Sequence, residues 1–143
     1  MPGHRTHEKT GLFTAPVVAA GSIYYGLSVP TTGILVLGYI FSTYFLSPDL
    51  DHDVGAASYR RWGFLKFVWY PYKRLVKHRS WISHSGPISA TLKIGYLLLW
   101  LLPLIYILPR EYLTYNPHYV ILWLSVALAD TAHCIMDLIW KDK

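Results

Sequence analysis

The chain has 143 residues, of which 53% are hydrophobic, 16% aromatic and only 15% charged, and its formal net charge is +5. Soluble domains carry about a quarter charged residues, so this composition argues against one and indicates a single membrane domain over residues 1–143. The single cysteine, Cys134, excludes an internal disulfide and a zinc module built on several cysteines. Because the basic residues lie beside apolar runs, anionic lipid headgroups or a phosphate-bearing substrate fit the charge better than nucleic acid.

Four apolar segments cover residues 12–29, 31–46, 88–108 and 119–140. Each is close to the ~20 residues that a membrane span needs, so the sequence predicts an all-α, four-helix transmembrane bundle made of two helical hairpins. A signal peptide is the alternative for the first segment, because Val18-Ala19-Ala20 resembles a cleavage site, but a second apolar segment follows at once. Lys93 lies near the start of the third segment, so its ammonium is expected to reach the membrane interface.

The polar interval, residues 47–87, is predicted to be a loop on the same side of the membrane as both termini. Seven of the 13 Lys and Arg residues fall in it, whereas only Arg110 lies on the opposite side. The positive-inside rule then predicts a multi-pass protein whose termini and central loop are cytoplasmic. In this topology the polar residues at the helix ends come to one face of the membrane: His7, Asp49, Asp51, His78, His84 and Asp137.

The last apolar segment carries the sharpest chemical signal, A-D-T-A-H-C-I-M-D. Asp130, His133 and Asp137 share one helical face, and ionisable groups at membrane depth generally belong to a functional site. His133 and Asp137 are one turn apart and are predicted metal ligands. Asp130 is predicted either to orient His133 or to bind a second ion. The alternative is that these groups only pair with one another, with Lys93 or with Arg79.

Two aspartates follow the second segment in S-P-D-L-D-H-D. In an extended chain Asp49 and Asp51 point the same way and offer two carboxylates at one edge. The alternative is a plain helix-exit turn, since S-P-D is common turn chemistry. His52 and Asp53 are weaker candidates because they are expected to face solvent.

Two histidines lie six residues apart in H-R-S-W-I-S-H. This spacing does not place His78 and His84 on one face of a regular helix, but a turn at residues 80–83 would bring them together. Arg79 and Lys77 would then supply positive charge for an anionic group. His78, His84 and His7 are each candidate ligands, with a plain interfacial histidine as the alternative for each.

Between these motifs, RRWGFLKFVWYPYKRL alternates basic and aromatic residues. Base stacking beside cations is one reading of such a pattern. The segment fits the headgroup region of a membrane better, with its aromatics at the interface and its cations toward anionic lipid.

Taken together, R-T-H, S-P-D-L-D, Y-R-R-W-G, H-R-S-W-I-S-H-S-G-P and the late H-x-x-x-D resemble a family of small, uncharacterised membrane proteins described as metal-binding. A looser likeness extends to the YdjM-type membrane-bound metal-dependent hydrolases. The first resemblance covers nearly the whole chain. It implies that the metal is bound by His7, Asp49, Asp51, His78, His84, His133 and Asp137.

Histidines and carboxylates without thiolates suit a divalent transition metal, Zn²⁺ first, with Mn²⁺ or Fe²⁺ as alternatives. The donors outnumber those of one tetrahedral ion, so one or two ions are expected. The leading hypothesis is a metal-dependent hydrolase of a phosphoester or related ester at the cytoplasmic membrane face. In it Asp51 takes the proton and Arg79 balances substrate charge.

Two other functions are compatible with the same residues. One is a non-catalytic membrane component, in which a structural metal site helps to dock a partner protein or lipid. The other is an ion transporter, which is the weakest because the first three apolar segments hold no acidic residue at depth.

Overall fold

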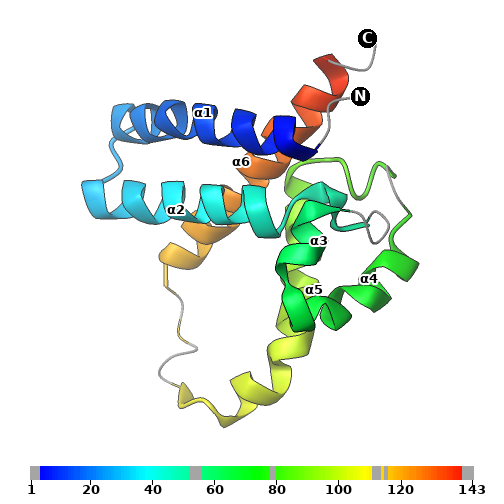
Figure 1. Ribbon diagram of the computed structural model, residues 1–143. Helices are drawn as coiled ribbons and strands as arrows, with labels where there is room; N and C mark the ends of the chain where they lie inside the picture. The colour runs from blue at the N-terminus through cyan, green and yellow to red at the C-terminus, as the bar shows by residue number, and fades with distance from the viewer. Residues whose placement is uncertain (1–3, 52–55, 78–79, 111–113, 115, 140–143) are drawn as a thin grey trace.

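The computed structural model describes residues 4–51, 56–77, 80–110, 114 and 116–139, and within these ranges the chain is helical without strands (Figure 1). The long helices are α1 (His4–Tyr24), α2 (Val29–Phe45), α5 (Pro87–Ile107) and α6 (His118–Ile139). Four short elements lie between α2 and α5: η1 (Pro48–Asp51), α3 (Ala57–Arg61), η2 (Gly63–Val68) and α4 (Trp69–Leu75). The all-α prediction is confirmed, but the polar interval is a series of short helical turns rather than a plain loop.

Helices α1 and α2 form a tight antiparallel pair, which Figure 1 shows side by side. Ser28 caps α2 by accepting a hydrogen bond from the Thr31 amide, and Pro30 suits the first turn because it has no amide hydrogen to leave unpaired. Gly11 lies so close to Thr43 that a Cβ at residue 11 would clash. Small residues therefore let these two helices approach closely.

Helix α6 packs against both α2 and α5, so it connects the two halves of the molecule. Ser125 of α6 fills the space that a side chain at Gly38 of α2 would need. At the other contact Gly86 precedes α5 with a φ of 57°, a left-handed conformation that favours glycine, and it lies against Thr131. The polar residues of α6 are thus held at a junction of helices.

The short helices pack on the core through aromatic side chains. Trp69 is fully buried and Tyr72 nearly so, and the Trp62 indole donates to the Phe45 carbonyl at 2.9 Å. Arg61 pairs with Glu8 at 2.7 Å and also donates to the carbonyl of Tyr44. These contacts fix the interval against the ends of α1 and α2.

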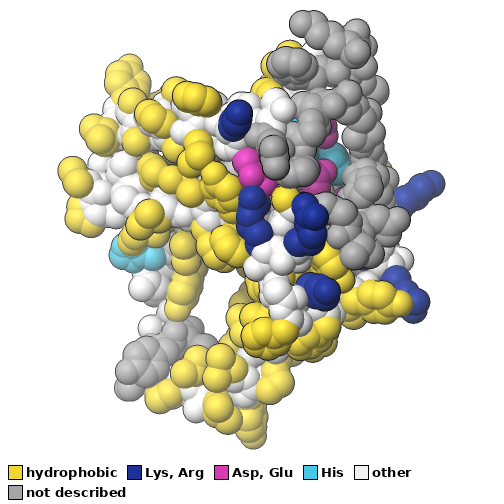
Figure 2. Space-filling model, viewed as in Figure 1, with side chains coloured by type: hydrophobic (Ala, Val, Ile, Leu, Met, Phe, Trp, Pro, Cys, Tyr) yellow, Lys and Arg dark blue, Asp and Glu magenta, His cyan; other side chains and the backbone are white. Residues whose placement is uncertain are grey.

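In the described part of the chain, three segments are long and apolar enough to cross a membrane: Val29–Asp51, Pro87–Ile107 and His118–Ile139. The prediction of four spans is corrected at α1, which begins at His4 and so carries polar residues in its first turns. Its apolar remainder, from Leu12 to Tyr24, is about 20 Å long at 1.5 Å per residue, less than the ~30 Å hydrocarbon core of a bilayer. Figure 2 shows hydrophobic side chains over much of the visible face, as suits a lipid-facing surface.

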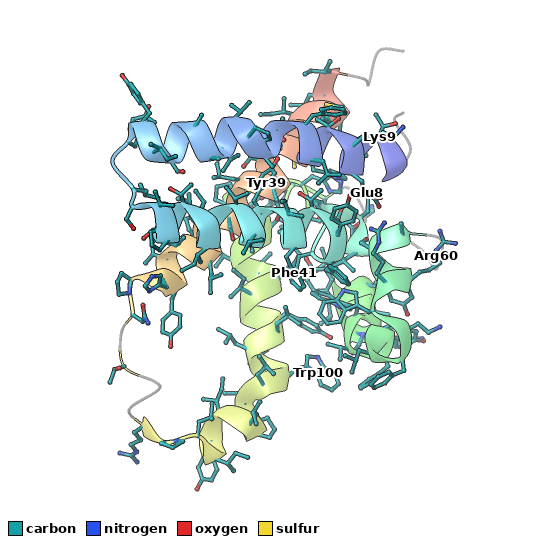
Figure 3. The ribbon with its side chains drawn as sticks, turned by 60° about the vertical axis from the view of Figure 1, so that its left-hand side comes forward. Glu8, Lys9, Tyr39, Phe41, Arg60 and Trp100 are labelled. Atoms are coloured by element: carbon teal, nitrogen blue, oxygen red, sulfur yellow. The ribbon has the colours of Figure 1, made fainter. Side chains whose placement is uncertain are left out.

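The arrangement also departs from two aligned hairpins. In Figures 1 and 3 the α1–α2 pair runs across α5 in both views rather than alongside it. The crossing brings the start of α1, the end of α2, the start of α5 and the last turns of α6 near one another.

Candidate metal centre

Six of the predicted ligands lie in one group where the helix ends meet. They come from four parts of the chain: α1 gives a histidine, η1 two aspartates, the turn before α5 a histidine, and α6 a histidine and an aspartate. They are His7, Asp49, Asp51, His84, His133 and Asp137.

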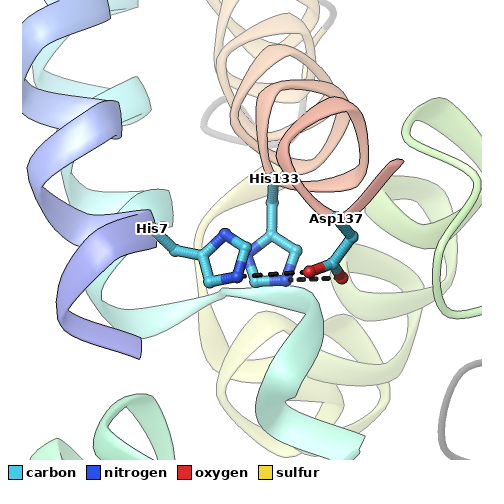
Figure 4. A group of neighbouring side chains, drawn as sticks. All are labelled: His7, His133 and Asp137. Carbon is cyan, nitrogen blue, oxygen red and sulfur yellow. Dashed lines mark ion pairs between the residues drawn. The ribbon is translucent and has the colours of Figure 1, made fainter. Parts of the chain in front are cut away.

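Asp137 is at the middle of the group. Its Oδ1 lies 3.2 Å from His7 Nε2, and its Oδ2 lies 3.6 Å from His133 Nε2 and 3.7 Å from His84 Nε2. Figure 4 shows the His7 and His133 rings side by side, with a nitrogen of each facing this carboxylate. The two rings stack with centroids 3.9 Å apart and planes inclined by 17°. One carboxylate therefore faces three imidazole nitrogens.

Asp49 adds a second carboxylate to the same group. Its Oδ1 lies 3.6 Å from His133 Nε2, and Asp49, His84 and His133 form a second set of candidate ligands that overlaps with His7, His133 and Asp137. Asp51 lies behind His84, with Oδ2 3.9 Å from His84 Nδ1. The extended geometry considered for Asp49 and Asp51 is absent, because η1 is a 3₁₀ turn.

The spacing of the donor atoms fits a bound metal. Good hydrogen bonds to oxygen measure about 2.7–3.2 Å, and the carboxylate–Nε2 distances of 3.2–3.7 Å lie at or beyond that range. Four donors placed 2.0–2.2 Å from one ion in a tetrahedron are about 3.3–3.6 Å apart. In addition, His133 Nε2 is buried and has no hydrogen-bond partner among the described residues. The side chains present therefore suit a divalent ion with nitrogen and oxygen ligands.

Burial prepares the histidines for metal binding. The pKa of His7 lies below its ordinary value because burial disfavours the imidazolium and the neighbouring His133 adds to that effect. Burial likewise lowers the pKa of His84, against the opposing charge of Asp51. Neutral imidazole is the form that binds metals, so both side chains are ready for it near neutral pH.

Two serines that the sequence analysis missed support the histidines. Ser47 Oγ lies 3.5 Å from His133 Nδ1, and Ser83 Oγ lies 2.9 Å from His84 Nδ1. Each partner sits on the ring nitrogen opposite the one that faces Asp137, as outer partners of metal-bound histidines do. Each serine lies beside a motif residue, but nothing in the sequence says that its hydroxyl turns toward a ring.

Asp130 belongs to a different cluster. Its Oδ1 lies 2.6 Å from Lys93 Nζ, and both side chains are almost completely buried. Lys93 also donates to the carbonyl of Leu46 at the end of α2. The expectation that Lys93 reaches the interface is wrong, because it turns inward to this pair. Asp130 therefore pairs with Lys93, which was the alternative in the sequence analysis.

The predictions for His78 and Arg79 concern residues that lie outside the described part of the chain. The turn predicted beside them is present, since the amides of Ser83 and His84 both donate to the carbonyl of Ser80. It presents His84 to the group.

The fold and this group of side chains define a helical metal-binding protein with three segments apolar enough to cross a membrane. The chain belongs to the family described as "Uncharacterized metal-binding protein (DUF2227)", whose model matches residues 2–143. The first of the two resemblances is thereby confirmed, while the likeness to the YdjM-type hydrolases stays a prediction.

A relative from Aquifex aeolicus (strain VF5), described as an uncharacterized protein, is 43% identical over 61 residues. This match spans 43% of the chain and 42% of the relative, less than half of either. No solved structure matches the chain.

Proposed function

We propose that this protein is a metal-dependent hydrolase that cleaves a phosphoester or related ester at the cytoplasmic face of a membrane. The observation that carries the proposal is the convergence of three imidazole Nε2 atoms on Asp137, with Asp49 beside them. Such a site offers more donors than one tetrahedral ion needs, so it can hold one or two ions. We expect Zn²⁺, with Mn²⁺ or Fe²⁺ as alternatives.

Exposure gives the site a direction of approach. The histidine side chains are 6–13% exposed, whereas Asp49 and Asp137 are 26% and 21% exposed. The histidines thus form the protein side of the site, and a substrate would enter from the carboxylate side. Family membership supports metal binding, and this partly open edge supports catalysis.

A bound divalent ion would supply Lewis-acid activation of water and charge stabilisation at phosphorus. Asp49, the most exposed of the three carboxylates, would take the proton of the attacking water. The sequence analysis assigned this role to Asp51, but the side chain of Asp51 is completely buried behind His84, which favours a role in fixing that ring. Lys77 is exposed and its carbonyl accepts from Ser83, so it lies near the His84 turn and, with Arg79, would balance substrate charge.

The test is turnover of bis(p-nitrophenyl) phosphate and p-nitrophenyl phosphate by detergent-purified protein loaded with Zn²⁺ or Mn²⁺. Asp49→Asn should remove turnover while some metal is retained. Thr91→Ala, at an exposed position on α5, should change neither. Metal-loaded wild type without turnover on any ester tested would contradict the hydrolase but not the metal site.

A structural metal site is the second candidate, and one observation favours it. The ligands come from α1, η1, the turn before α5 and α6, so one ion would tie four separate segments together. The protein would then serve as a membrane component that docks a partner protein. Slow metal exchange and no exchangeable water on the ion, measured by water relaxation with Mn²⁺, would support this function over catalysis.

The short helices are our proposed contact with anionic lipid. Phe64 and Phe67 are 83% and 52% exposed, with Lys66 between them, and Arg74 stacks on Tyr70 at 4.6 Å. Apolar rings flanked by cations suit the headgroup boundary of a membrane. We infer from the distribution of basic residues that this side, where the start of α1 meets the end of α6, faces the cytoplasm.

A further inference from the structure

A small cavity lies beside His7 and His133, and Asp137 is not among the residues that line it. Its volume is about 20 Å³, and α1, α2 and α6 all contribute to its wall. The residues with polar side chains that line it include His7, Tyr39, Ser42, Asp130 and His133. The cavity thus lies between the candidate metal centre and the Lys93–Asp130 pair.

Three buried polar atoms on residues of this wall lack hydrogen-bond partners among the described residues. They are His7 Nδ1, Ser42 Oγ and Asp130 Oδ2, and the hydroxyl of Ser89 on α5 also lies close to the Asp130 carboxylate. Ser42 and Asp130 are completely buried, and His7 is 9% exposed. Leaving a buried polar group unpaired costs about 1–3 kcal/mol, so three of them around one cavity point to a shared partner.

A water molecule fits both the space and the chemistry. A buried water needs at least about 10–15 Å³ and two to four polar partners. It can accept a hydrogen bond from His7 Nδ1–H while donating one to Asp130 Oδ2 and the other to Ser42 Oγ. We propose that this cavity holds one ordered water, and that Asp130 and Ser42 position His7 through it.

The consequence for the metal centre concerns which ring nitrogen carries the proton. A partner at Nδ1 keeps the hydrogen there and leaves the Nε2 lone pair directed at Asp137 and the metal. His133 and His84 have serine hydroxyls at this position, so the water would give His7 the support that Ser47 and Ser83 give the other two rings. Lys93 would hold the far end by fixing Asp130.

This inference rests on His7 as a metal ligand but not on hydrolysis, so it is tested by binding. Ser42→Val should displace the water with a methyl group, and we expect Zn²⁺ affinity, measured by chelator competition, to fall about 10–100-fold. Ser42→Ala should weaken binding less. Ser125→Ala is the matched control, because Ser125 is also completely buried in the α2–α6 contact but does not line the cavity.

The second readout is ¹⁵N NMR of the His7 ring in Zn²⁺-loaded protein. Wild type should carry its ring proton on Nδ1 with slow solvent exchange, and both Ser42 variants should exchange it faster. Should Ser42→Val fail to fold, Ser42→Ala decides. Unchanged affinity and exchange in a folded Ser42 variant would overturn the proposal. So would unchanged affinity in His7→Ala, or wild type that binds no Zn²⁺, whereas absent turnover alone would count only against the hydrolase.

Discussion

Two carboxylates on the same face of α6 have opposite surroundings. Asp130 is fully buried, and its Oδ1 meets the Lys93 ammonium at 2.6 Å. Asp137, two turns further on, is 21% exposed, and its ion-pair partners among the described residues are imidazole nitrogens at 3.2–3.7 Å. In the first arrangement the protein itself supplies the countercharge, whereas in the second a bound cation would supply it. A buried acidic residue in a membrane helix is therefore a guide to function only once its partner is known.

The largest effect is expected when the Lys93–Asp130 pair is broken. Lys93→Met leaves the Asp130 carboxylate buried without its cation, which costs about 3–5 kcal/mol of stability. We expect this variant to lose most of its folded fraction. The double variant Lys93→Met/Asp130→Leu should recover most of the stability, because apolar residues can replace a buried ion pair.

Unfolding in detergent, followed by circular dichroism, measures both variants. A Lys93→Met protein as stable as wild type would mean that this pair is not the structural contact we describe.

The next largest effect is expected on metal retention by the ligand group around Asp137. His133→Ala removes the imidazole that faces both Asp49 and Asp137, so we expect Zn²⁺ retention after dialysis to fall from about one or two equivalents to near zero. His118→Ala is the matched control, since His118 begins the same helix but is exposed and pairs with Asn116. Elemental analysis at equal protein concentration compares them. Equal retention in the two variants would place the metal elsewhere.

The third prediction concerns acid, which should protonate the histidines around Asp137. Burial lowers the pKa of His7 and His84 below 6.5, so the folded protein binds fewer protons than the unfolded chain below that pH. The stability of the metal-free protein should therefore fall as pH drops through 6.5 toward 5, and metal affinity should fall with it because protons compete for the rings.

Denaturation and Zn²⁺ titrations at pH 7.5, 6.5 and 5.5 check this direction. A His7→Ala/His84→Ala variant should show a shallower dependence of stability on pH. Stability that rises on acidification in wild type would contradict the assigned cause.

The smallest effect concerns the lipid contact. Lys66→Gln/Arg74→Gln should reduce co-purified anionic lipid a few-fold, seen by native mass spectrometry, without changing Zn²⁺ content. Lys9→Gln, an exposed cation on α1, serves as the control for net charge. Equal loss of lipid in both proteins would mean that overall charge, not the short helices, retains it.

Much of the candidate site could be predicted from the sequence because helix periodicity is regular. The spacing of His133 and Asp137 places them one turn apart, and topology brings His7 and His84 to the same end. Side-chain partners could not be predicted in the same way. Asp130 lies on the right face, yet nothing local to it shows that Lys93, 37 residues earlier, turns inward to meet it.

The fold was predictable to a similar depth. Apolar runs locate α2, α5 and α6 to within about two residues, but α1 extends into the polar N-terminus because His4 to Lys9 continue its helix. The 3₁₀ turn at η1 changes where Asp49 and Asp51 point, and such turns have no strong sequence signature. The way α5 packs on α6 depends on close contacts such as Gly86 with Thr131, which periodicity does not encode.

The most direct test of the metal centre is X-ray absorption spectroscopy of the Zn²⁺-loaded protein, wild type beside His84→Ala. We predict only nitrogen and oxygen ligands at about 2.0–2.1 Å, with imidazole scattering that decreases in the variant. A sulfur ligand at about 2.3 Å, which only Cys134 or a methionine could supply, or spectra that do not differ between the two proteins, would contradict the account.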